Sequence, residues 1–145
     1  MDTNNDKSVL NNIYQNAQTA SHGISDLMPK ITNSSFRDDL KQQDSEYRSI
    51  QQQATQQLIQ MGDTPSEIGA ITRAGLWASV NTKTIMNTDT SHLAEVMITG
   101  SNMGITNMTK ILNTYQNPNP QVQTLARQLI TTEQQHIERL KSYLG

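Results

Sequence analysis

Cysteine is absent from the 145 residues of this sequence. Its absence excludes disulfide bonds, thiolate nucleophiles and cysteine-based zinc or iron–sulfur sites. Long apolar runs are absent too, whereas a membrane-spanning helix needs about 20 such residues. Neither positive nor negative charge dominates, because the formal net charge is -2 and the basic residues are scattered along the chain. We therefore expect no membrane segment and no nucleic-acid partner, since nucleic-acid binding requires a basic patch.

The first ten residues, MDTNNDKSVL, contain no positive region followed by an apolar core. We therefore expect no secretory signal, which leaves the cytoplasm as the default location. A chain of this length predicts one domain, 1–145, because single domains typically have about 100–200 residues. Residues 1–6 are expected to form a disordered tail.

What the sequence does contain is helical periodicity. Apolar residues recur every three or four positions in four long stretches, 7–31, 36–61, 92–116 and 121–144, which is typical of amphipathic helices. The abundant Gln, Asn and Thr residues alternate with them, as expected for solvated helix faces. The prediction is an all-α four-helix bundle.

The breaks between these stretches set the expected topology. Ser34 or Ser35 can cap the second helix, and Gly62 suits the left-handed residue that ends it. Thr64 and Pro65 can begin a shorter helix over 67–87. Residues 117–120, NPNP, end the third long helix. Short loops join antiparallel neighbours, whereas the long middle connection predicts a helical crossover that makes the second and third long helices parallel.

Several polar residues fall on the apolar faces. A helical wheel places Glu133 and His136 inside on the last helix, and Gln43 and Tyr47 inside on the second, with Asp44 at the edge. Gln43, Tyr47, Glu133 and His136 also lie at similar depths along the bundle. We therefore predict that these four side chains form one buried polar cluster. Its expected small neighbours are Ala17, Ala20, Ser21 and Gly100. A buried carboxylate must be hydrogen-bonded, paired with the imidazole or bound to a metal.

This layout, with Glu133-x-x-His136 facing inward, resembles the ferritin-like four-helix bundles. The stretch DTSHLAEVMITGSNMGI, residues 89–105, is similar to a motif of small uncharacterised bacterial members. In the di-iron and di-manganese members, two helices each supply a Glu and the other two each supply a Glu-x-x-His. The resemblance implies that Glu133 and His136 match the last-helix motif, and that the second helix offers at best Asp44 and Tyr47.

The remaining positions of that pattern are unmatched. Glu95, the only glutamate on the third long helix, falls on the solvent face, and the first helix turns no carboxylate inward. His22 and His92 lie away from the apolar arcs. The resemblance therefore implies an incomplete metal centre.

We predict a ferritin-like binding or structural protein with a degenerate metal site, assembled as a homo-oligomer, without a cofactor and with no identified small ligand. The alternative is a metal-handling or redox protein that holds iron or manganese. Its metal ligands would be Glu133, His136, Asp44 and Tyr47, with Glu95 as an alternative to Asp44 or Tyr47. The sequence shows no serine nucleophile elbow, phosphate-binding glycine loop or dinucleotide fingerprint, so no reaction is predicted.

Overall fold

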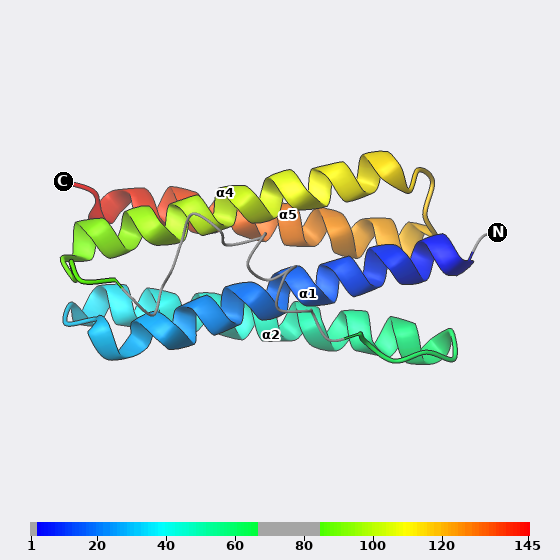
Figure 1. Ribbon diagram of the computed structural model, residues 1–145, viewed down its shortest axis with the longest axis horizontal. Helices are drawn as coiled ribbons and strands as arrows, with labels where there is room; N and C mark the ends of the chain where they lie inside the picture. The colour runs from blue at the N-terminus through cyan, green and yellow to red at the C-terminus, as the bar shows by residue number, and fades with distance from the viewer. Residues whose placement is uncertain (1–2, 67–84) are drawn as a thin grey trace.

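The computed structural model describes residues 3–66 and 85–145, and this part of the chain forms a bundle of long helices (Figure 1). The helices are α1 (Thr3–Leu27), α2 (Ser34–Gln60), α4 (Thr90–Thr114) and α5 (Pro120–Leu140), with short 3₁₀ helices η1 (Met28–Lys30) and η3 (Lys141–Tyr143). The described residues include no strand. The all-α prediction is confirmed.

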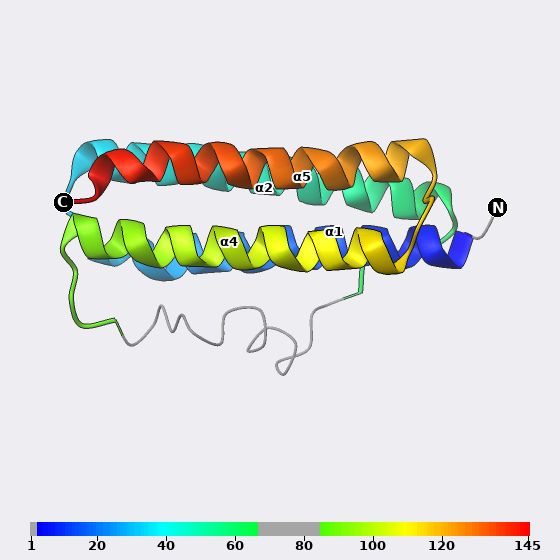
Figure 2. The ribbon, with the colours of Figure 1, turned by 90° about the horizontal axis from the view of Figure 1, so that it is seen from above.

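The helices form two antiparallel pairs, α1 with α2 and α4 with α5 (Figures 1 and 2). In both views α2 and α4 run in the same direction, as the long crossover predicts. In addition, α1 contacts α4 and α5, and α2 contacts α5. Most of the predicted helix over 67–87, with Trp77, lies outside the described residues. Its last three residues, 85–87, are not helical.

The helix ends depart from the sequence prediction in two places. Asn33 caps α2, because its side chain accepts a hydrogen bond from the Phe36 N–H at 2.9 Å, and both Ser34 and Ser35 lie inside the helix. The first helix ends at Leu27 rather than at residue 31. The 3₁₀ helix η1 follows it directly and has a proline near its start. Proline disfavours a helical conformation in the residue before it, which explains the change of helix type.

The expected N-terminal tail is wrong for residues 3–6, which form the first turn of α1. Asp6 is only 2% exposed, and its Oδ1 accepts a hydrogen bond from the Asn119 N–H at 2.8 Å. This contact satisfies a backbone donor in the turn between α4 and α5. The first turn of α1 is therefore held against the α4–α5 end of the bundle.

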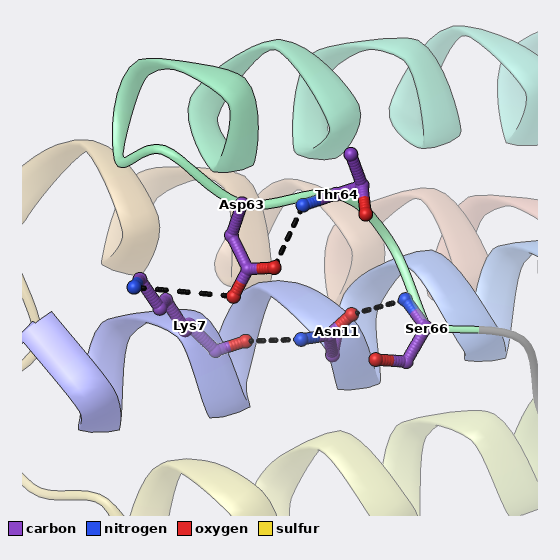
Figure 3. A network of polar contacts seen from close by, with 5 residues as sticks. All are labelled: Lys7, Asn11, Asp63, Thr64 and Ser66. Carbon is purple, nitrogen blue, oxygen red and sulfur yellow. Dashed lines mark hydrogen bonds and ion pairs between the residues drawn. The ribbon is translucent and has the colours of Figure 1, made fainter.

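The crossover begins as a segment that lies along α1 (Figure 3). Gly62 has φ 77°, which confirms its predicted left-handed conformation. Asp63 Oδ2 lies 3.9 Å from Lys7 Nζ, and the Ser66 N–H donates to Asn11 Oδ1 at 2.7 Å. Gln15 Nε2 donates to the Ser66 carbonyl at 3.1 Å. These contacts hold residues 63–66 in a non-helical conformation, where a helix starting at Thr64 and Pro65 was expected.

The core runs along the bundle axis and contains buried side chains from every long helix. Its largest fully buried apolar members include Leu10, Ile24, Phe36, Leu58, Leu93 and Met97. None of the helices described is long and apolar enough to cross a membrane. The polar residues predicted inside the bundle interrupt this core.

Candidate functional site

A polar cluster lies between α2 and α5 inside the bundle. Gln43 and Tyr47 come from α2, and Glu133 and His136 come from α5. All four are at most 4% exposed. Residues three or four positions apart share one face of a helix, so each pair points in one direction. The predicted placement of these four side chains is confirmed.

Tyr47 is the centre of the cluster. Its hydroxyl forms a hydrogen bond with Glu133 Oε1 and a second one, of 3.0 Å, with His136 Nδ1. The phenol and imidazole rings meet edge to face, with centroids 5.0 Å apart and planes at 80°. Both neighbours on α5 are therefore oriented by one hydroxyl on α2.

Glu46 is a member of the cluster that the sequence prediction missed. Its Oε2 is hydrogen-bonded to His136 Nε2, the ring nitrogen that Tyr47 does not use. Its side chain is 36% exposed, so it lies at the rim, whereas the His136 side chain is 2% exposed. Glu46 comes three residues after Gln43, which places it at the border of the buried face of α2. That spacing was the available signal.

The other two helices present small or neutral groups to the cluster. The buried α1 residues include Ala17 and Ala20. On α4, a Cβ atom at Gly104 would overlap with Glu133 Oε2, so glycine leaves room for the carboxyl group. Ser101 Oγ is buried nearby, close enough to affect the pKa of Glu133 and Tyr47, although it forms no hydrogen bond of good geometry with the part of the chain that the structure describes.

Burial shifts the protonation of the cluster toward neutral forms. It raises the pKa of Glu133 from 4.5 to about 8, although the nearby hydroxyls of Tyr47 and Ser101, which favour the charged carboxylate, act in the opposite direction. It lowers the pKa of His136 below 6.5, against the opposing effect of Glu46. It also raises the pKa of Tyr47 well above 10, helped by the charge of Glu133. Burial therefore favours the protonated carboxyl group of Glu133 and the uncharged imidazole of His136.

Asp44, the fourth residue of the predicted metal set, lies apart from the cluster. Its Oδ1 accepts a hydrogen bond from Ser21 Oγ, and its Oδ2 accepts one of 2.9 Å from Arg48 Nε. The structure thus brings together three of the four predicted residues and leaves out Asp44. Of the Asp44 and Tyr47 pair suggested for α2, only Tyr47 faces α5.

The positions of Glu95, His92 and His22 agree with the sequence prediction. Glu95 is exposed, as expected, and its Oε2 lies 3.7 Å from Nδ1 of His92 on the same helix. His22 is exposed on α1. No hydrogen bond joins any of these three to the cluster within the described ranges, 3–66 and 85–145.

Gln43 is an unusual member of the cluster. It is fully buried, and neither its Oε1 nor its Nε2 has a hydrogen-bond partner among residues 3–66 and 85–145. An unpaired buried amide costs free energy, so its retention at this position is unexplained by the contacts of the described residues.

The donor set does not fit a dinuclear metal centre. Such a centre needs acids from all four helices, and here the described parts of α1 and α4 supply none at this level. Both ring nitrogens of His136 are engaged, and no group of three or more His, Asp or Glu side chains among residues 3–66 and 85–145 could hold a metal ion. Metal binding by Glu133, His136, Asp44 or Tyr47 stays a prediction.

The two antiparallel pairs, the parallel α2 and α4 and the long crossover define a ferritin-like four-helix bundle. The structure is similar to that of a dodecameric thioferritin, the bacterioferritin-related protein from Bacteroides fragilis, with a TM-score of 0.76 and 13% sequence identity. The match covers 99% of this chain and 86% of that chain. A likeness at this identity shows the fold alone. No protein-family model and no curated protein matches the sequence.

Proposed function

We propose that the chain is a ferritin-like protein that has kept the bundle without a dinuclear metal centre and acts in binding or as a structural subunit. The observation that carries the proposal is the composition of the bundle centre. Glu133 is the one acid buried there among the described residues, and a tyrosine hydroxyl and a glycine surround its carboxyl group. One buried acid cannot neutralise and bridge two cations.

The experiment is metal analysis of protein purified from cells grown with iron and manganese. We expect less than one metal ion per chain, and the same content in Glu133→Gln and in Glu138→Gln. Glu138 is the matched control because it lies on the same helix with its side chain 72% exposed. Stoichiometric iron or manganese that disappears only in Glu133→Gln would overturn the proposal and favour a metal-handling protein.

We further propose that the chain assembles as a homo-oligomer. The support is the fold shared with a thioferritin that is dodecameric. In addition, α4 carries apolar side chains that are only partly buried in the described chain, namely Val96, Ile98, Ile111 and Leu112. Light scattering coupled to gel filtration should give a mass that is a multiple of 16.2 kDa. A mass equal to that of one chain at micromolar concentration would contradict this.

A further inference from the structure

The face of the bundle formed by α2 and α5 divides into a charged half and an uncharged half. In α2, seven of the fifteen residues from 34 to 48 are Asp, Glu, Lys or Arg. None of the twelve residues from 49 to 60 belongs to these types, and six of the twelve are glutamine. In α5, residues 120–126 contain none of these types either, whereas the last turn contains Glu138 and Arg139. The solvent face of an amphipathic helix usually carries charged as well as polar residues, so the uncharged half is unusual.

The uncharged parts of the two helices lie side by side. Since α2 and α5 run in opposite directions, the C-terminal half of α2 and the N-terminal half of α5 are found at the same end of the bundle (Figures 1 and 2). Gln57 Nε2 donates to the Gln121 carbonyl at 3.4 Å and joins the two helices there. We call the glutamines that reach the surface of this half the amide surface. Its members are Gln52, Gln53, Gln56, Gln57, Gln121 and Gln128.

The amide surface is hollowed where the two helices meet. The hollow has a volume of about 340 Å³, and four glutamines, Gln53, Gln57, Gln121 and Gln128, contribute to its lining. In the described part of the chain, no Asp, Glu, Lys or Arg lines it. A partner that enters the hollow therefore meets amide groups and no charged side chain of these described residues.

The chemistry of these side chains indicates which partner they suit. Each glutamine amide carries both hydrogen-bond donors and an acceptor, so it can pair with an identical amide. In a twofold interface the same patch of each subunit meets itself, and a residue near the axis faces its own copy. A charged residue at that place would face a like charge, which is costly, whereas a glutamine can bond to its twin. The cores of protein interfaces are also depleted in Lys, Glu and Asp.

We propose that the amide surface is the contact between two copies of this chain, related by a twofold axis that passes near Gln56 and Gln128. The inference rests on the proposed homo-oligomer and names the face through which two copies meet. With the axis perpendicular to the helices, the charged halves of the two copies point away from each other into solvent. The uncharged halves then overlap.

The test is the mass of the assembly, measured by light scattering coupled to gel filtration over a range of concentrations. Gln56→Lys combined with Gln128→Lys adds like charges to both sides of the contact. We expect a smaller mass than that of the unmodified protein, or a concentration of half-dissociation that is at least about tenfold higher. Both side chains are exposed, and lysine and glutamine have similar helix propensities, so the variant should keep its helical circular dichroism.

The chain offers a closely matched control. Gln42 and Gln135 are exposed glutamines on the same two helices, and they lie in the charged half. Their separation from Gln56 and Gln128 is fourteen and seven residues, so each shares a helix face with its counterpart. Gln42→Lys with Gln135→Lys should therefore keep the mass of the unmodified protein. An equal loss of mass in this control variant would overturn the inference.

A mixing experiment separates repulsion from damage to the fold. Gln56→Glu with Gln128→Glu should dissociate like the lysine variant, since like charges again meet across the axis. An equimolar mixture of the glutamate and lysine variants should recover the mass of the unmodified protein, because each interface then pairs opposite charges. Failure of the mixture to associate would count against a contact at these two positions.

The outcomes distinguish this inference from the proposal on which it rests. If the unmodified protein is an oligomer and the lysine variant at Gln56 and Gln128 keeps its mass and its dissociation, the inference is wrong and the homo-oligomer stands. If the unmodified protein is a single chain at micromolar concentration, both are wrong.

A second measurement uses the absence of cysteine from the sequence. Gln56→Cys and Gln42→Cys each introduce a unique thiol on the outer side of α2. A short bifunctional maleimide should join Gln56→Cys into covalent dimers in much higher yield than Gln42→Cys. Equal yields for the two variants would contradict a twofold axis near Gln56.

Discussion

The two halves of the bundle contribute to its centre in opposite ways. Helices α2 and α5 supply large polar side chains that bond to one another, such as Tyr47 and Glu133. The described parts of α1 and α4 supply uncharged groups there, such as Asn16 and Gly104. The comparison teaches that the two halves depend on each other, because the carboxyl group of Glu133 occupies the volume that Gly104 leaves open. A bundle that binds two metals would need acids from both halves.

The largest effect is expected from a substitution of Tyr47, the centre of the polar cluster formed by α2 and α5. Tyr47→Phe keeps the ring but removes the hydroxyl, which leaves Glu133 and His136 buried without their common partner. Each unsatisfied group costs about 1–3 kcal/mol, so we expect a loss of about 3 kcal/mol in the free energy of unfolding, measured with urea. Tyr143→Phe is the control, because Tyr143 donates to Asp39 nearer the surface. If Tyr47→Phe lost no more unfolding free energy than Tyr143→Phe, the central role of the Tyr47 hydroxyl would be contradicted.

The second-largest effect is expected on α4, one of the two helices that supply uncharged groups to the centre. Gly104→Ala adds a Cβ that overlaps with Glu133 Oε2. Overpacking costs about 1–3 kcal/mol, and the better helix propensity of alanine offsets about 0.5–1 kcal/mol, so a net loss of about 1 kcal/mol is expected. Asn102→Ala, on the exposed side of α4, is the control. In Glu133→Ala the same Gly104→Ala change should cost less, since the clash is gone, and full additivity would show that the two halves are independent.

A smaller effect is expected at the rim. Glu46→Gln keeps an oxygen that can accept from His136 but removes the charge, so we expect a loss of about 1 kcal/mol. Glu46 raises the pKa of His136, so the ring should become still harder to protonate in this variant. The ¹⁵N NMR titration of His136 checks this, with Glu138→Gln as control. Easier protonation of His136 would show that Glu46 is not its partner.

The smallest effect is expected outside the cluster. Asp44→Asn alters contacts with Ser21 and with Arg48, whose side chain is 64% exposed. Exposed ion pairs contribute little, so the change in unfolding free energy should stay near or below about 1 kcal/mol, and the His136 signals should not move. A shift of those signals would place Asp44 in the cluster and restore it as a candidate ligand.

The helical period was enough to predict the four buried polar side chains of α2 and α5. Because 3.6 residues complete one turn, the burial of Gln43, Tyr47, Glu133 and His136 follows from their spacing relative to the apolar residues. The parallel course of α2 and α4 follows from the length of the crossover. These predictions needed only local geometry and chain connectivity.

Contacts between helices could not be predicted in this way. Glu46 reaches His136 through a flexible side chain from the edge of its helix, and a wheel does not record such reach. Asn33, Ser34 and Ser35 are all good N-caps, so the sequence left the start of α2 ambiguous by two residues. Burial of Asp6 depends on a turn more than a hundred residues away.

The contacts of the crossover bear on how the chain reaches its topology. Ser66 is hydrogen-bonded to Asn11 in the N-terminal half of α1, and the Ile85 carbonyl accepts a hydrogen bond of 3.1 Å from Lys30 in η1, which follows the C-terminal end of α1. The part of the crossover between these two contacts is shorter than the full connection between α2 and α4. The entropic cost of closing a loop is lower when the loop is shorter. Both ends of the crossover are thus bonded to the segment formed by α1 and η1, and these two attachments favour the parallel placement of α2 and α4.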